Sequence, residues 1–134
     1  MNVLVDTCVW SHAFRRAIAP DATAHHLNEL IKQNRAQILG VVRQEILSGI
    51  RYEQQFLKLR NAMRAFVDLS LDVAHYELAA SIANKCRSKG LQGSVVEFLI
   101  CAVGVLDRIE IYTTDNDFVR YARHVPIRLY KPRL

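Results

Sequence analysis

Two kinds of hydrophobic pattern alternate along the chain: short runs that are apolar at almost every position, and longer stretches in which apolar residues recur every three or four positions. The short runs are typical of buried strands, and the longer stretches are typical of helices that bury one face. The predicted strands are residues 2–5, 36–39, 66–69, 109–112 and 127–130. The predicted helices are residues 7–14, a helix capped by Asp21, and residues 41–49, 54–65, 72–89, 95–106 and 116–123.

This order of elements predicts the fold class. Strands separated by helices pair in parallel and are joined by right-handed crossovers. We therefore expect an α/β fold, a three-layer α/β/α sandwich with a central parallel sheet. The chain has 134 residues without a linker, repeat or low-complexity segment, so we expect residues 1–134 to form a single domain.

Composition and the distribution of apolar residues indicate in which cellular compartment to expect the protein. Hydrophobic residues make up 51% of the chain, which is enough for a full core. No apolar run reaches the ~18 residues of a membrane span, and the amino terminus lacks the features of a secretory signal. We therefore expect a cytoplasmic protein with no membrane contact. Cys8, Cys86 and Cys101 form no CxxC pair, and we expect them to be reduced and mostly buried.

The net charge of +5 comes from 18 basic and 13 acidic residues. A basic surface attracts polyanions such as RNA. Charge alone is equally compatible with a solvated basic face. If several acids gather in one pocket, however, the remaining surface is more basic than the net charge indicates.

Two aspartates follow apolar runs near the two ends of the chain. Asp6 comes directly after residues 1–5, and Asp115 comes directly after residues 109–114. In an open parallel sheet the ligand crevice lies beyond the carboxyl ends of the strands. The two carboxylates can therefore meet at one cation, although they are far apart in sequence.

Two glutamates lie among apolar residues in predicted helices. Glu45 is predicted to share the face of its helix that packs on the sheet. Glu97 is the only charged residue between positions 95 and 106, with Cys101 and Gly104 beside it leaving room for a pocket. A buried charge is costly unless it is paired. Each glutamate therefore either forms a buried salt bridge or joins Asp6 and Asp115.

Four gathered carboxylates require a counter-ion. Two of them ~4 Å apart repel by about 4 kcal/mol at an effective dielectric constant of about 20. Oxygen ligands favour Mg²⁺ or Mn²⁺ over zinc. Such a site can activate water and polarise a phosphoryl oxygen, which phosphodiester hydrolysis requires. Thr7 and Thr113 can orient a carboxylate or a water, and Thr7 can equally serve as a helix cap.

Four stretches, in this order, carry a family resemblance: residues 3–7 (Val-Leu-Val-Asp-Thr), 43–47 (Arg-Gln-Glu-Ile-Leu), 93–102 (Gly-Ser-Val-Val-Glu-Phe-Leu-Ile-Cys-Ala) and 112–118 (Tyr-Thr-Thr-Asp-Asn-Asp-Phe). The chain resembles PIN domains, and most of all the VapC-type toxins of prokaryotic type II toxin–antitoxin systems. The resemblance implies an endoribonuclease that depends on Mg²⁺ or Mn²⁺ and cleaves tRNA or other structured RNA. It also implies a homodimer and a cognate antitoxin protein that blocks the carboxylate pocket.

By the same resemblance, the catalytic acids are Asp6, Glu45, Glu97 and Asp115, and the metal ligands are Asp6, Glu97, Asp115 and Asp117. The role of Asp117 as a helix-start acid is an alternative. Glu97 departs from the family pattern, which normally has aspartate there. The added methylene extends the carboxylate by roughly 1.5 Å, and a misplacement of ~1 Å can cost about 10²-fold in rate. The replacement is consistent with a natural variant, a compensated site or an attenuated enzyme.

Two other functional classes of protein share some of these residues. A PIN-like module weakened at Glu97 would bind RNA or a partner protein without cleaving RNA. A haloacid-dehalogenase-like phosphatase also begins with a strand-end aspartate, but that class carries a second aspartate where this chain has Cys8. The sequence therefore favours a metal-dependent endoribonuclease, with the binding-only module as the alternative.

Overall fold

The structure is a computed structural model that describes residues 1–16 and 18–132. Its strands are β1 (Val3–Val5), β2 (Ala36–Gln37) and β3 (Glu110–Tyr112). Its helices are α1 (Thr7–Arg15), α2 (Ala22–Lys32), α3 (Gly40–Ser48), α4 (Glu53–Met63), α5 (Val73–Ser88), α6 (Val95–Leu106) and α7 (Asp117–Tyr121). None of the helices in this described part combines the length and the apolar character that crossing a membrane needs.

The sheet is parallel, with the strand order β2-β1-β3. Val3 of β1 lies opposite Ala36 on one side and Glu110 on the other. Single parallel bridges extend the sheet at both edges, from Ile38 to Asp68 and from Ile111 to Leu129. The predicted strands 66–69 and 127–130 are therefore wrong in extent, since each contributes only one bridge.

Side-chain and proline chemistry explain why these edge strands are so short. Residues 64–66 continue the turn that ends α4, and Arg43 donates from Nη1 and Nη2 to the carbonyls of Met63 and Phe66 there, at 2.8 and 2.6 Å. At the other edge, Pro126 and Pro132 flank the segment. Proline cannot donate to a ladder, which confines pairing at that edge.

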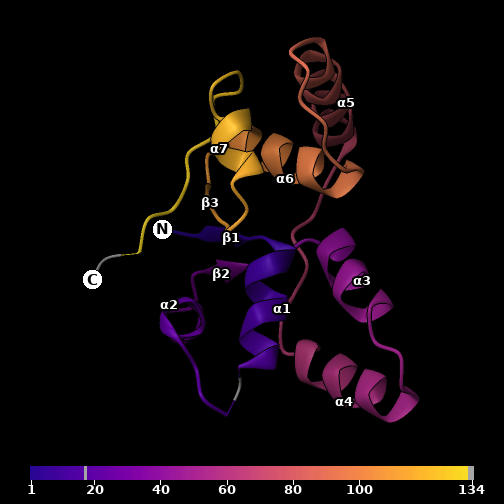
Figure 1. Cartoon of the computed structure of the whole chain (residues 1–134), viewed down its shortest axis with the longest axis vertical. Helices are drawn as coiled ribbons and strands as arrows, with labels where there is room; N and C mark the ends of the chain where they lie inside the picture. Colours follow the sequence, from indigo (N-terminus) through magenta and orange to yellow (C-terminus); the bar gives the residue numbers. More distant parts are fainter. Residues whose placement is uncertain (17, 133–134) are drawn as a thin grey trace.

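Two groups of helices cover the sheet, with α1 to α4 gathered on one side of the strands and α5 to α7 on the other (Figure 1). The chain moves from β1 to β2 through α1 and α2, and returns through α5 and α6 to β3 on the opposite side of β1. Right-handed crossovers in opposite directions place helices on opposite faces. The predicted three-layer sandwich is confirmed. Its topological switch point lies between β1 and β3.

The core is built around β1 and α6, which are apolar on every side. Val3, Leu4 and Val5 are fully buried, and so is every residue of α6 from 98 to 104. Gly104 serves packing, because a Cβ there would lie 2.9 Å from Cδ1 of Ile111. The prediction that Gly104 leaves room for a pocket is therefore wrong, since the glycine lets α6 lie directly against β3.

Several predicted helix ends are confirmed by their capping contacts. The Asp21 side chain accepts the N–H of Ala24 at 3.0 Å and begins α2. Gly90 follows α5 with φ +76°, a conformation that glycine adopts without strain. The last helix is shorter than predicted, because α7 ends at Tyr121 and not at residue 123.

Candidate functional site

Asp6 lies at the carboxyl end of β1 and caps α1. Its Oδ1 accepts the N–H of Thr7 at 2.8 Å, which makes Asp6 the N-cap residue. The prediction that Thr7 caps the helix is therefore wrong, since Thr7 is the first helical residue. Only 5% of Asp6 is exposed, so this charged group is held away from water.

Thr113 connects Asp6 with the end of β3. The Thr113 hydroxyl donates to Oδ2 of Asp6 at 2.8 Å and accepts the N–H of Asp115 at 3.0 Å. Cys8 donates to the same Asp6 oxygen at 3.2 Å. The two strand-end aspartates are thus held next to each other across the switch point by a shared side chain.

Burial raises the pKa of the Asp6 carboxyl, and the neighbouring charge of Asp115 adds to the rise. Hydrogen bonds from Thr113, Cys8 and Thr7 act in the opposite direction. Burial prevails because few water molecules can solvate the charge. A cation nearby would favour the ionised form.

Three other carboxylates form a cluster at the same end of the sheet, beyond the carboxyl ends of the strands. Glu97, Asp115 and Asp117 are each half-buried, and one oxygen of each lies within 4.8 Å of the others. Glu97 comes from the first turn of α6, Asp115 comes from the segment between β3 and α7, and Asp117 is the first residue of α7. The N–H of Asp117 donates to Oδ1 of Asp115 at 2.9 Å, and Arg120 pairs with Oδ1 of Asp117 at 2.7 Å.

Glu97 also belongs to a capping box. Its Oε1 accepts the N–H of Ser94 at 2.8 Å, while the Ser94 hydroxyl accepts the N–H of Glu97 at 3.1 Å. Burial raises the pKa of Glu97, and the charges of Asp115 and Asp117 add to the rise. The hydrogen bonds from Ser94 counteract part of this increase.

Glu45 does not pack on the sheet as predicted. Helix α3 buries Val42 and Ile46, and Glu45 is exposed because it lies ~100° from Ile46 around the helix axis. Its Oε1 accepts the hydroxyl of Thr7 at 2.6 Å. Thr7 thus donates to Glu45 through its side chain and to Asp6 through its backbone.

The predicted site residues therefore occupy two connected groups and not a single ring of four acids. A hydrogen-bonded line contains Glu45, Thr7, Asp6, Thr113 and Asp115. The three-acid cluster shares Asp115 with that line. Sequence reasoning did not find Ser94, Cys8 or Arg120 as neighbours of the acids. The Ser-x-x-Glu spacing of residues 94–97 was a readable capping signal.

The donor set of the cluster fits a hard divalent cation. Mg²⁺ binds oxygen at ~2.0–2.1 Å and usually keeps several waters, which places opposite ligands about 4.2 Å apart. The 4.8 Å limit on the carboxylate separations fits an ion held partly through its own waters. The cluster contains only carboxylates, whereas zinc prefers histidine or cysteine.

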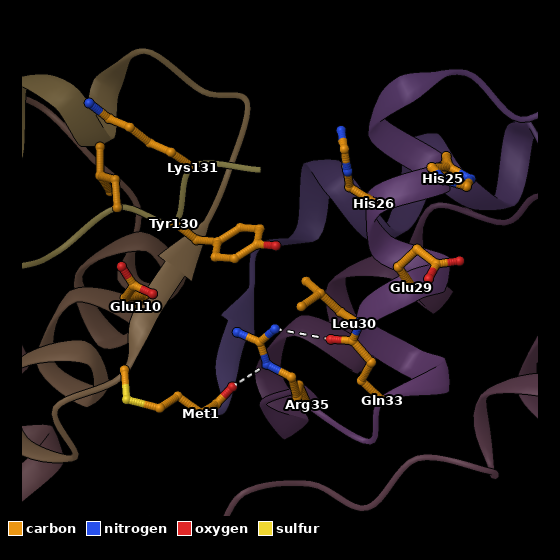
Figure 2. A pocket seen from close by; sticks show the side chains of 11 residues that line it. Met1, His25, His26, Glu29, Leu30, Gln33, Arg35, Glu110, Tyr130 and Lys131 are labelled. Atoms are coloured by element: carbon orange, nitrogen blue, oxygen red, sulfur yellow. Dashed lines mark hydrogen bonds between the residues drawn. The ribbon is translucent and has the colours of Figure 1, made fainter. Parts of the chain in front are cut away.

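A hollow of about 840 Å³ lies at the opposite end of the sheet, where the three strands begin (Figure 2). Met1, Arg35 and Glu110 line it from positions at or before the first residues of the three strands. Arg35 is held there by the carbonyl of Met1 and the side chain of Gln33. This hollow shares no residue with the acids described above, so it does not belong to their chemistry.

The fold and the acids define a class: a parallel α/β protein with carboxylates beyond the strand ends at the switch point. A PIN domain family model matches residues 3–124, so the chain belongs to the PIN domain family. No curated protein matched the sequence.

Solved structures share the fold at low sequence identity. VapBC2 from Rickettsia felis, bound to a DNA fragment from its promoter, has a TM-score of 0.77 at 19% identity and covers 97% of this chain and 98% of that chain. FitAcB from Neisseria gonorrhoeae has a TM-score of 0.75 at 16% identity, with 96% of each chain covered. A toxin–antitoxin complex from Klebsiella pneumoniae has a TM-score of 0.61 at 16% identity and covers 87% and 90%.

Proposed function

We propose that this chain is the toxin of a toxin–antitoxin pair, an endoribonuclease that uses Mg²⁺ or Mn²⁺ to cleave tRNA or other structured RNA. The observation that carries the proposal is the three-acid cluster, with carboxylate oxygens within 4.8 Å of one another, next to buried Asp6 at the switch point of a PIN domain. Carboxylate clusters of this kind hold the divalent ions that phosphodiester cleavage needs.

The acids are assigned different tasks. Glu97, Asp115, Asp117 and Asp6 hold the cation directly or through its waters. When bound, the cation lowers the pKa of water and stabilises the negative charge that develops on the phosphoryl oxygens. Glu45 is exposed, so its carboxylate can take up a proton from water at the rim. Thr7 fixes the position of Glu45 relative to Asp6.

Charge supports RNA as the substrate. The chain carries a net charge of +5. Because several of its acids are gathered at one end of the sheet, the rest of the surface is more basic than this value indicates. Arg120 pairs with Asp117 and is half exposed, which places a guanidinium beside the acid cluster. A guanidinium at that position can contact a phosphate that approaches the site. Binding to RNA should accordingly weaken as salt increases.

A groove supports the antitoxin as a partner. Residues of α1, α3 and the segment leading into and through α4 line an open, largely apolar hollow of about 680 Å³, with Phe14, Ile46 and Leu59 among its walls. Glu45 lies on the wall of this groove. A partner segment bound there would cover Glu45 and one end of the hydrogen-bonded line. The structural neighbours include toxin–antitoxin complexes, which is consistent with such a partner.

Cleavage of total tRNA tests the proposal. The wild-type protein should cleave with Mg²⁺ or Mn²⁺ and stop when EDTA is added, and Asp6→Asn should abolish cleavage. Asparagine is as good an N-cap as aspartate, so the fold should persist, as circular dichroism would show. Glu77→Gln, at an exposed position of α5, is the matched control and should cleave normally. Equal cleavage by wild type and Asp6→Asn would refute the assignment.

One observation favours a second candidate, a catalytically weak PIN-like module that binds RNA or a partner protein. Two of the clustered acids already have protein partners, because Ser94 binds an oxygen of Glu97 and Arg120 binds an oxygen of Asp117. Such a module would retain RNA in a gel-shift assay and show no EDTA-sensitive cleavage with either metal. Metal-dependent cleavage by the wild type rejects this candidate.

A further inference from the structure

The capping box at the start of α6 includes Glu97, the glutamate of the acid cluster that stands where the family pattern normally has aspartate. Ser94 and Glu97 exchange two hydrogen bonds, one from each backbone N–H to the other side chain, at 2.8 and 3.1 Å. Only Oε1 of Glu97 takes part in this exchange. The same carboxyl group also offers an oxygen to the cluster with Asp115 and Asp117. Glu97 therefore caps the helix and belongs to the acid cluster at the same time.

The hydrogen bond determines how far the glutamate reaches. A glutamate is one methylene longer than an aspartate, which adds roughly 1.5 Å when the side chain is extended. In a capping box the side chain at the third helical position turns back toward the N-cap backbone. In this turned-back position an oxygen of Glu97 lies within 4.8 Å of an oxygen of Asp115 and of Asp117.

The same bond keeps a charge in an unfavourable place. Glu97 is half-buried, and one of its oxygens lies within 4.8 Å of an oxygen of Asp115 and of Asp117. The Ser94 N–H lies at the N-terminus of α6, where backbone donors and the helix dipole favour an anion. Without that donor the carboxylate would turn away from the two aspartates toward solvent, and a cation bound among the acids would lose a ligand.

We propose that the backbone N–H of Ser94 has a positioning role: it fixes one oxygen of Glu97 and thereby presents the Glu97 carboxylate, in company with Asp115 and Asp117, to a divalent cation. This inference rests on the proposed function, since it needs the cation site. It assigns the glutamate at this position to a compensated site and not to an attenuated one. Ser94 touches neither substrate nor reacting atoms, and it acts through Glu97.

Two substitutions at position 97 separate the capping contact from the charge. Glu97→Gln keeps an oxygen that can accept the Ser94 N–H and loses the negative charge. Glu97→Asp keeps the charge and is one methylene too short for the reciprocal bond. Amide hydrogen exchange of Ser94 in metal-free protein reports the bond itself. The amide should be protected in the wild type and in Glu97→Gln, and exchange faster in Glu97→Asp.

Mn²⁺ affinity of the full chain, measured by titration calorimetry, tests the positioning role. Loss of a group that orients a metal ligand typically weakens metal binding about 10- to 100-fold, so Ser94→Pro, which lacks the N–H that donates to Glu97, should weaken Mn²⁺ binding about 10-fold. Ser94→Ala loses the hydroxyl, keeps the N–H and should bind Mn²⁺ normally. In the Glu97→Asp background, where the bond is already lost, Ser94→Pro should cause no further loss.

Asp72→Ala is the matched control for loss of a cap. Asp72 is the N-cap of α5 in a second capping box and lies at the far end of α6, where His75 bonds to Asp107. It should lower the melting temperature as Ser94→Ala does, with Mn²⁺ affinity unchanged. Unchanged affinity in Ser94→Pro, an equal loss by Ser94→Pro in both backgrounds at position 97, or tighter Mn²⁺ binding by Glu97→Asp would each overturn the inference.

The measurements separate this inference from the proposed function. If the wild type binds Mn²⁺ and cleaves tRNA while Ser94→Pro binds equally well, only the positioning role fails. If the wild type neither binds Mn²⁺ nor cleaves, the proposed function fails and the positioning role fails with it. In that case, protection of the Ser94 amide assigns the bond to helix capping alone.

Discussion

The hydroxyl of Thr113 donates to Asp6 over 2.8 Å and joins the ends of two strands that are separated by more than a hundred residues in sequence. The same hydroxyl accepts the N–H of Asp115 at 3.0 Å. A single side chain therefore ties the carboxylate of Asp6 to the backbone of Asp115. It also donates to a buried charge that would otherwise depend on a thiol and one backbone N–H.

Thr113→Val should weaken the site while nearly preserving side-chain shape. Valine removes both the donor to Asp6 and the acceptor for the Asp115 N–H. We expect Mn²⁺ affinity to fall about 10- to 100-fold, as for other groups that orient metal ligands. The metal-free protein should also lose about 1–3 kcal/mol of unfolding free energy, because a buried charge loses a donor. Calorimetric titration and urea unfolding measure the two effects.

Thr114→Val is the control for this substitution. Thr114 is exposed and donates to Sγ of Cys8 at 3.3 Å, without contacting a carboxylate. Its loss should leave Mn²⁺ affinity within about twofold of the wild type, since exposed substitutions have small effects. Similar losses of affinity in the two valine variants would show that the Asp6 contact is not what matters.

Asp6 gives a pH dependence to the stability of the metal-free protein. Its pKa is raised from the ordinary value of 3.8, chiefly by burial. A raised pKa means that the folded state holds the proton more tightly, so the contribution of Asp6 to stability is present below pH 3.8 and is lost as pH rises through the folded-state pKa. In EDTA, Asp6→Asn should therefore be more stable than the wild type near neutral pH and show no such advantage below pH 3.8.

Added Mn²⁺ should reverse that order near neutral pH. A ligand at 100 times its dissociation constant stabilises the folded state by about 2.7 kcal/mol, and the wild type should gain more than Asp6→Asn. Thermal melts with EDTA and with Mn²⁺ at two pH values measure both effects. If the wild type is the more stable protein in EDTA at neutral pH, burial of Asp6 is not the destabilising factor inferred here.

The sequence predicted correctly that Asp6 and Asp115 lie at the same end of the sheet, because parallel strands end at a common edge, whatever their separation along the chain. Their role as metal ligands stays a prediction. It failed for Glu45, because a 3.6-residue period identifies the helix and leaves the centre of the buried stripe uncertain by one residue. Val42 and Ile46 occupy that stripe, and Glu45 stands beside it. The strand at residues 66–69 was overpredicted because the turn after α4 extends to Phe66, where Arg43 binds the carbonyls of Met63 and Phe66, a tertiary contact that the local pattern does not contain.

His75 provides a second pH dependence, remote from the acids. It is buried at the start of α5, where Nε2 lies 2.9 Å from Asp107 and Nδ1 lies 3.1 Å from Asp72. The bond to Asp107, and then the nearby charges of both aspartates, raise the pKa of His75 from 6.5, against the effect of burial. A histidine with a raised pKa contributes stability that is fully present below the unfolded value and is lost as pH rises through the folded value.

His75→Gln should therefore destabilise the protein most at acidic pH, by about 1 kcal/mol for the lost hydrogen bonds. The difference from the wild type should shrink as pH rises above 6.5. Urea unfolding between pH 5 and 8 measures this trend. His25→Gln, at an exposed position of α2, is the control and should follow the wild-type curve. A constant difference across this range would indicate a packing role for His75 without titration.

Gly104 tests whether the packing of α6 on β3 fixes the position of Glu97. A Cβ at this position would lie 2.9 Å from Cδ1 and 3.2 Å from Cγ1 of Ile111, inside a buried contact. Overpacking of this kind costs about 1–3 kcal/mol, and Gly104→Ala should lose that much in urea unfolding. Ile111→Val deletes Cδ1, so the double variant should lose less than the sum of the two single variants.

The functional consequence follows from the same helix. Because α6 carries Glu97 and β3 leads to Asp115, pushing the helix away from the strand separates two members of the acid cluster. Gly104→Ala should weaken Mn²⁺ binding even at temperatures where the protein is fully folded, and Ile111→Val should restore part of that affinity. Additive effects on stability, with Mn²⁺ affinity unchanged throughout, would mean that Glu97 is positioned by its capping box alone and not by the packing of α6 on β3.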